Sequence, residues 1–120
     1  LLPSCLQEKI NRRTEDISRG WELVRKELND NNVTEQFKAT HNDYIINFSS
    51  DGVFNESYAD GLGTLQDITG TWFFLNNVNE LKLEDGSQER FYDILELNGA
   101  RLTLQTLNTD DVEVFYLEPL

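Results

Sequence analysis

The sequence predicts an all-β fold: an eight-stranded antiparallel up-and-down barrel with one short helix between the first two strands. Three observations lead to this prediction. From Ile17 onward, short alternating or apolar runs are separated by clusters of Gly, Asn and Asp. The connections between these runs are too short for crossover helices, so neighbouring strands should be antiparallel. Closing the sheet would remove both of its hydrogen-bonding edges and hide its apolar face from water.

Each expected element follows from a local pattern. Residues 1–16 show neither strand alternation nor a helical apolar stripe, so we interpret them as a polar tether ahead of a barrel domain at residues 17–120. Between the first two strands, Asn32 and Glu35 have the spacing of a capping box, which predicts a short helix; an irregular loop is the alternative. The eight strands are expected at residues 19–28, 43–49, 53–59, 69–75, 80–84, 89–97, 102–107 and 112–117.

The expected turns contain residues that are suited to tight reversals of the chain. Ser50-Asp51-Gly52 and Asp85-Gly86-Ser87 tolerate positive φ, and Asn98-Gly99 is the pair favoured in a type I′ hairpin. Thr109-Asp110-Asp111 provides another turn. Consecutive strands should therefore be joined by hairpins.

Side-chain parity predicts the inner face of each strand. The strand at 43–49 should place Tyr44, Ile46 and Phe48 inside the barrel. The strand at 69–75 is apolar on both sides, so a cover is expected over Phe73 and Leu75 on its outer face. The other residues expected to face inward are Phe54, Glu56, Tyr58, Trp72, Phe74, Leu102, Leu104, Val112, Val114 and Tyr116.

The composition excludes several classes of partner. With 10 basic and 22 acidic side chains the net charge is −12, so phosphate backbones and anionic lipid headgroups would repel the protein. We therefore expect no nucleic-acid partner. No apolar run approaches the roughly 20 residues of a membrane-spanning helix, and the single Cys cannot close an internal disulfide.

Groups for catalysis or metal binding are few. His41 is the only His, and no Gly-x-Ser-x-Gly elbow is present. The acidic residues Asp110, Asp111 and Glu113 lack the spacing of an EF-hand loop and indicate a solvated turn. Glu56 could act as a general acid if it were buried, although a solvated position near the barrel mouth is the simpler interpretation. The sequence thus predicts a protein that is not an enzyme and has no cofactor and no metal.

The N-terminus resembles the end of a bacterial lipoprotein signal peptide. Leu2, the small Ser4 and then Cys5 are similar to a lipobox, although Pro3 departs from its commoner residues. The resemblance implies that residues 1–4 are the remnant of a leader and that Cys5 carries a diacylglyceryl group. Burial of its acyl chains would hold the protein on a membrane despite the negative charge. A free thiol near a frayed terminus is the alternative.

The body of the chain resembles the lipocalin-like domains of bacterial envelope lipoproteins. That family has a Gly-x-Trp strand followed by a strand that ends in Phe-x-x-Asp-Gly-x-Phe, and the segment from Phe48 through Asp51-Gly52 to Phe54 matches the second pattern. The first Trp, Trp21, departs from the pattern because its glycine, Gly20, is adjacent, whereas a second such element, Gly70-Thr71-Trp72, has the Gly-x-Trp spacing. Lipocalins often stack a basic side chain of the last strand on the first Trp, and residues 112–117 contain no Arg or Lys.

Aromatic residues on the inner faces are the candidates for a ligand pocket, with a packed core as the alternative. The candidate ligand-binding residues are Trp21, Tyr44, Phe54, Glu56, Tyr58, Trp72, Phe74 and Tyr116.

The resemblance implies a noncatalytic, lipid-anchored binding module of the bacterial cell envelope, at the outer membrane, that holds a small apolar ligand or an envelope partner. The alternative is a structural or protein-interaction domain with a filled barrel, and a small hydrolase or isomerase is a third hypothesis. A cavity above roughly 300 Å³ would favour the binding module. A filled interior with an exposed apolar patch would favour the interaction domain, and convergent polar groups with strongly shifted pKa values would favour the enzyme.

Overall fold

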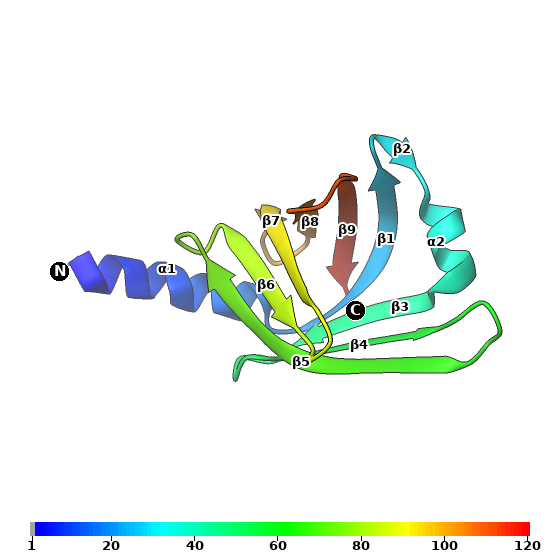
Figure 1. The fold of residues 1–120 in the computed structure, drawn as a ribbon. Coiled ribbons are helices and arrows are strands. Elements are labelled where there is room, and N and C mark those ends of the chain that lie inside the picture. Colours follow the sequence, from blue (N-terminus) through cyan, green and yellow to red (C-terminus); the bar gives the residue numbers. More distant parts are fainter. Residues whose placement is uncertain (1) are drawn as a thin grey trace.

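The computed structural model describes the backbone of residues 2–120 and the side chains from Cys5 onward (Figure 1). The side chains of the expected leader remnant, residues 1–4, and the whole of Leu1 lie outside the described part. The elements in chain order are α1 (Leu2–Ile17), β1 (Gly20–Leu28), β2 (Asn31–Asn32), α2 (Thr34–Thr40), β3 (Asn42–Phe48), β4 (Val53–Ala59), β5 (Leu65–Leu75), β6 (Glu80–Glu84), β7 (Glu89–Leu97), β8 (Leu102–Leu107) and β9 (Glu113–Pro119).

The strands form a closed antiparallel barrel. Its order is β1-β3-β4-β5-β6-β7-β8-β9, and β9 pairs back onto β1, which leaves the two-residue β2 as an appendage of β1. The predicted fold class and all eight predicted strands are confirmed. The largest difference in bounds is at β5, which begins at Leu65 because residues 65–68 pair with the end of β4.

The predicted short helix between the first two barrel strands is also confirmed, although its cap differs from the capping box. The helix α2 begins at Thr34, and the Asn32 side-chain oxygen accepts hydrogen bonds from the Thr34 backbone N–H (3.0 Å) and hydroxyl (2.6 Å). Thr34 also accepts a bond from the Lys26 N–H, 3.0 Å away. These bonds tie the start of α2 to β1 and hold the helix beside one end of the barrel (Figure 1).

The N-terminal segment, which we expected to be a polar tether, is a helix that the sequence patterns did not predict. The helix α1 projects away from the barrel (Figure 1) and contains no Gly, while its only Pro lies in the first turn, where proline is tolerated. Most of its described side chains are exposed, which explains the missing apolar stripe. Its last residue, Ile17, is fully buried, and the Ile17 carbonyl accepts a hydrogen bond from Trp21 Nε1 at 3.0 Å. The helix is therefore joined to the barrel core through its last turn.

A packed core fills the end of the barrel nearest to α1. Trp21, Phe48, Phe54 and Trp72 are all buried there, as the inward parity of β3, β4 and β5 predicts. Gly70 makes this packing possible, because a Cβ at this position would lie 2.1 Å from the Glu84 carbonyl oxygen of the neighbouring strand. This close approach gives a physical reason for the glycine of the second Gly-x-Trp.

A basic side chain does lie over Trp21, the first Trp, but its residue precedes β1 and is not part of the last strand. The Arg19 guanidinium is 5.7 Å from the centre of a Trp21 ring and donates a hydrogen bond to the Gly99 carbonyl at 3.2 Å.

Two predictions about strand faces are wrong. On β9, Phe115 and Leu117 pair with Leu104 and Leu102 of β8 and share their inner face, whereas Tyr116 faces outward and donates a hydrogen bond to Glu27 (3.0 Å). Both faces of β9 carry large apolar side chains, so the pattern alone did not distinguish them.

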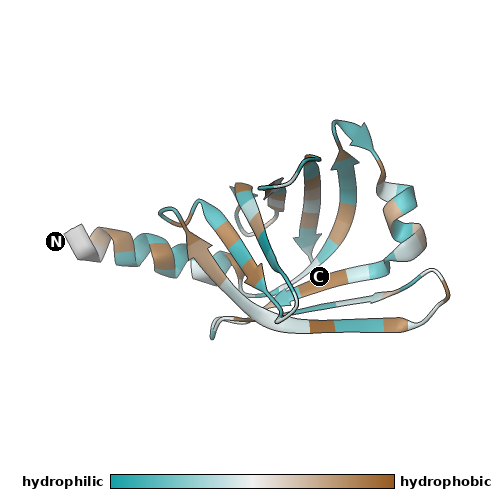
Figure 2. Cartoon of the chain, viewed as in Figure 1, coloured by the Kyte–Doolittle hydropathy of each residue, from teal (hydrophilic) through white to brown (hydrophobic). Residues whose placement is uncertain are grey.

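On β5, no cover lies over the outer face within the described part of the chain. Phe73 is 47% exposed and Leu75 38% exposed. The Lys82 ammonium lies 5.8 Å from the centre of the Phe73 ring and shields it only in part. On the neighbouring β6 the regular alternation of apolar and polar residues is visible as brown and teal bands (Figure 2).

Candidate functional site

The opposite end of the barrel, beside α2, is hollow. A cavity of about 590 Å³ lies there, bordered by α2 and by the turns that follow β6 and β8. Phe37, His41, Tyr44, Tyr58 and Phe115 form much of its wall. The barrel thus has a packed end and a hollow end, and its strands run from one to the other.

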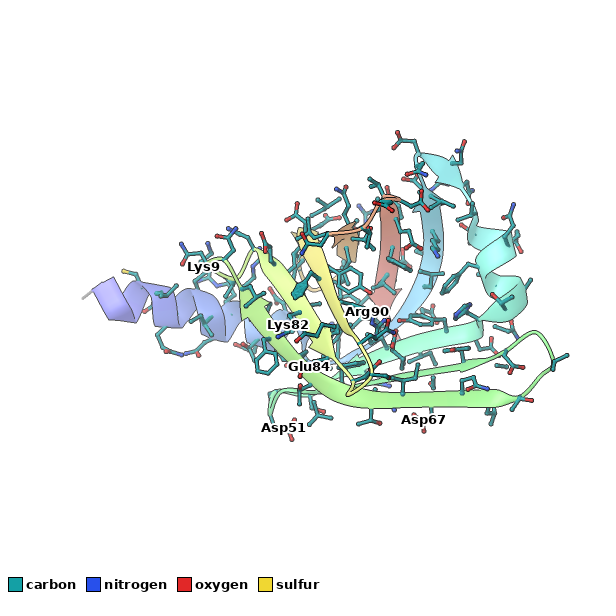
Figure 3. The ribbon with its side chains drawn as sticks, viewed as in Figure 1. Lys9, Asp51, Asp67, Lys82, Glu84 and Arg90 are labelled. Carbon is teal, nitrogen blue, oxygen red and sulfur yellow. The ribbon has the colours of Figure 1, made fainter. Side chains whose placement is uncertain are left out.

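A charged cluster lies at one side of the cavity. Glu56 on β4 is only 3% exposed, and the Arg90 guanidinium on β7 donates two hydrogen bonds to its carboxylate, at 2.5 Å and 3.1 Å. The Tyr44 hydroxyl of β3 donates to the same carboxylate. Figure 3 shows Arg90 within the ring of strands. The hairpin of β3 and β4 and the more distant β7 therefore supply a buried charge pair and a hydroxyl that donates to it.

The pKa shifts at this cluster favour the neutral form of its tyrosines and the charged form of Arg90. Burial, together with the nearby charge of Glu56, raises the pKa of Tyr44 well above its usual value. Burial also raises the pKa of Tyr92. For Arg90 burial acts in the opposite direction, but the hydrogen bonds with Glu56 and the electrostatic attraction of Tyr92, Glu56 and Tyr44 together outweigh it, and the pKa is raised. At neutral pH both tyrosines are therefore neutral and the arginine is charged.

A second ion pair lies across the cavity. The Lys26 ammonium of β1 is 2.7 Å from a Glu113 carboxylate oxygen of β9. The same ammonium lies 4.5 Å from the centre of the Phe37 ring and 5.0 Å from that of Phe115. The cation is thus held between two aromatic faces and a carboxylate.

His41 completes the aromatic wall at the end of α2. Its ring is stacked on Phe37 with 4.2 Å between ring centres, and it lies 4.4 Å from the centre of the Tyr58 ring. Burial lowers the pKa of His41, and the nearby Lys26 charge acts in the same direction. The imidazole is therefore neutral at pH 7 and behaves as a flat aromatic surface.

The structure separates the predicted ligand-binding residues into three groups. Tyr44, Glu56 and Tyr58 line the cavity. Trp21, Phe54, Trp72 and Phe74 belong to the core or pack against it, and Tyr116 is on the outer face. The predicted lipid-attachment residue, Cys5, is exposed on α1, outside the barrel.

Several cavity residues were not predicted from the sequence, above all Lys26, Arg90 and Phe115. The lining also departs from the expected apolar surface, because it includes Lys26, Glu56, Glu89, Arg90 and Glu113. A signal for Arg90 was present: it shares a strand face with Tyr92 and Ile94, which makes it a basic residue on an inner face, and Glu56 is its acidic counterpart on β4.

Metal sites and membrane-spanning helices are both lacking among the described residues. No group of three or more His, Cys, Asp or Glu side chains between residues 2 and 120 is arranged so that it could hold a metal ion. In the same part of the chain, neither helix has the length and apolar character needed to cross a membrane.

A closed up-and-down barrel that is packed at one end and hollow at the other is the architecture of small-ligand binding barrels such as the lipocalins. The chain belongs to the lipocalin-like domain family, whose pattern matches residues 19–104. Domains with this fold typically bind ligands and are not catalysts.

Similar solved structures come from two bacteria and a crustacean. A lipocalin-like protein from Bacteroides uniformis is 14% identical, with a TM-score of 0.60 over 86% of this chain and 98% of that chain. An uncharacterized protein from Bacteroides eggerthii is 13% identical, with a TM-score of 0.60 over 86% and 99% of the two chains. Lobster apocrustacyanin A1 is 12% identical, with a TM-score of 0.65 over 97% and 67%. Comparison with the curated proteins found no match. At these identities the likeness shows the fold alone.

Proposed function

We propose that this protein is a noncatalytic binding module of the bacterial cell envelope, which holds a small ligand in the barrel and is anchored to the outer membrane through a lipid on Cys5. The cavity of about 590 Å³ supports the binding role most directly. Its volume lies within the range of roughly 300–1,000 Å³ that is usual for small-molecule sites. Walls from strands on all sides of a closed barrel make the site largely preformed, so little ordering is required when a ligand enters.

The absence of catalysis is supported by the direction of the pKa shifts in the cavity. A general acid or base works best when its pKa lies near the working pH. The shifts of Tyr44 and Arg90 move both groups away from neutral pH, so proton transfer from either becomes harder. The Glu56 carboxylate is already occupied by hydrogen bonds from these two side chains. The cluster fits a structural and ligand-orienting role.

One observation favours the alternative role of a protein-interaction domain. Phe73 and Leu75 are exposed on the outer face of β5, where a partner could cover them. That alternative predicted a filled barrel, and the cavity beside α2 argues against it. Binding inside the barrel therefore has the stronger support.

We predict that native mass spectrometry of protein purified from its own host will show a bound small molecule. A matched pair of variants tests whether the molecule occupies the cavity. Ile68 lines the cavity from β5, whereas its neighbour Thr69 is exposed. Ile68→Trp should fill part of the cavity and abolish the bound mass, and Thr69→Trp should leave it unchanged. Equal loss in both variants, or a bound mass that survives Ile68→Trp, would count against a ligand in the barrel.

The lipid anchor has a separate test. Cys5 is exposed on the helix that projects from the barrel, which leaves its thiol accessible to a modifying enzyme. In the native host, the full-length precursor should fractionate with membranes, and its Cys5→Ser variant should move to the soluble fraction because the acyl chains are lost. Ser4→Ala, which keeps a small side chain before the thiol, should remain membrane-bound. If Cys5→Ser also stays in the membrane fraction, the proposed anchor is wrong.

A further inference from the structure

The charges around the cavity are paired with one another. Arg90 is bonded to Glu56, Lys26 to Glu113, and Glu89 to Lys82 at 3.0 Å on the neighbouring strand. Lys82 also lies 3.4 Å from a Glu84 carboxylate oxygen, so each of these cations and carboxylates has an opposite charge beside it. Burial drives His41, at the end of α2, toward its neutral form by lowering its pKa.

A charged ligand would have to compete with these pairs. An anion would need to take Lys26 from Glu113 or Arg90 from Glu56, and a cation would need to take one of the carboxylates. Either exchange leaves an unpaired charge in a partly buried site, which costs more than the new pair returns. The overall charge of −12 further disfavours an anion. The electrostatics of the cavity thus favour a neutral molecule.

The shape of the cavity lining favours a flat ligand. Phe37 is stacked on His41, and its ring also meets Tyr44 and Phe115 edge-on, with centres 5.6 Å and 6.1 Å apart. Tyr92 meets Phe115 edge-on at 6.1 Å. These rings form a connected aromatic wall from α2 to β7. Such a wall gains more from a π-face than from a flexible alkyl chain, which would also lose rotamer freedom on binding.

We propose that the cavity binds a neutral, planar aromatic molecule in preference to charged molecules, fatty acids among them, and to uncharged alkyl chains. This inference rests on the proposed binding function and defines the ligand class for the same site. Hydrogen-bonding groups on the wall, such as the Tyr58 hydroxyl and the side chains of Asn108 and Gln88, can accept or donate to polar substituents of such a ring.

The ligand class can be tested by calorimetric titration of the whole chain with four matched probes. They are naphthyl methyl ketone, naphthoate, naphthylmethylammonium and a straight-chain methyl ketone with as many carbon atoms as the naphthyl ketone. The neutral naphthyl ketone should bind most tightly, with each of the other three weaker by roughly tenfold or more, as expected for the loss of a paired charge or of ring stacking. Tighter or equal binding of either ion, or of the alkyl ketone, would overturn the proposal while leaving a binding module in place. Binding of none of the four would contradict this proposal, and absence of a native ligand as well would contradict the proposed function.

Three variants test the two parts of the argument separately. Phe37→Leu removes a ring of the wall and should weaken the naphthyl ketone roughly three- to tenfold, whereas Phe73→Leu on the outer face should not. Glu113→Gln frees the Lys26 ammonium and should strengthen naphthoate about tenfold relative to the neutral ketone. If naphthoate binding does not respond to Glu113→Gln, the ion pairs do not set the charge preference. If Phe37→Leu leaves the naphthyl ketone unaffected, the aromatic wall does not recognise the ring.

Discussion

Replacement of Trp72 by Ala is expected to lower the free energy of unfolding by about 3–5 kcal/mol, the cost of removing a large aromatic side chain from a packed core. Trp72 is 6% exposed and meets the rings of Phe48 and Phe74 edge-on, with centres 5.8 Å and 5.1 Å apart. Its indole N–H donates a hydrogen bond to the Ser49 carbonyl at 2.9 Å. The substitution therefore creates a cavity and leaves a backbone acceptor without its partner.

Urea denaturation and thermal melting measure this effect. The melting temperature of Trp72→Ala should fall by more than about 10 °C. Phe73→Ala, one residue along the same strand, provides the control because its ring faces outward and is half exposed. It should cost less than about 1 kcal/mol. Equal losses in the two variants would mean that the inner and outer faces of β5 are assigned wrongly.

Replacement of Arg90 by Met should have the second large effect, about 3 kcal/mol of destabilisation at pH 7. The change preserves much of the side-chain volume but leaves the Glu56 carboxylate without either of its guanidinium hydrogen bonds. Removing one partner of a buried pair typically costs about 3–5 kcal/mol. We expect the lower end of that range because the Arg90 side chain is 23% exposed and cavity water can reach it.

A double variant gives this prediction a specific signature, because removing the charge of Glu56 as well should remove the cost of stranding it. The double variant Glu56→Gln with Arg90→Met should recover most of the stability at pH 7. Arg25→Met, which breaks an exposed pair with Glu27, is the control and should cost far less stability than Arg90→Met. A deficit that persists in the double variant would show that lost packing, not the stranded carboxylate, is responsible.

The strands and the closure of the barrel could be predicted because their signals are local and repeated. Alternating runs and turn residues such as Asp51-Gly52 specify where each hairpin lies, and a sheet of this length has an apolar face that must be hidden. The cavity could be predicted only in part. Tyr44, Glu56 and Tyr58 were found because parity places them inside, whereas Trp21 and Trp72 face inward at the packed end. Side-chain parity predicts whether a residue faces into the barrel or away from it. It does not predict whether an inward-facing residue lies at the packed end or at the hollow end.

Two further errors have the same kind of cause. The inner face of β9 is set by its pairing with β8, where Leu104 lies opposite Phe115, and that register is not visible in residues 112–117 alone. The helix α1 has an exposed, polar surface, so the search for an apolar stripe missed a segment whose helical propensity is nevertheless good.

The sequence by itself determined the fold class, the strands, their hairpin order and the net negative charge, because these depend on composition and on patterns within a few residues of one another. Tertiary structure alone decided the character of the cavity. Arg90 and Glu56 are 34 positions apart, and Lys26 and Glu113 meet only because the last strand closes onto the first. An ion pair is a property of distance in space, and only the closed barrel brings these charges close enough to neutralise one another.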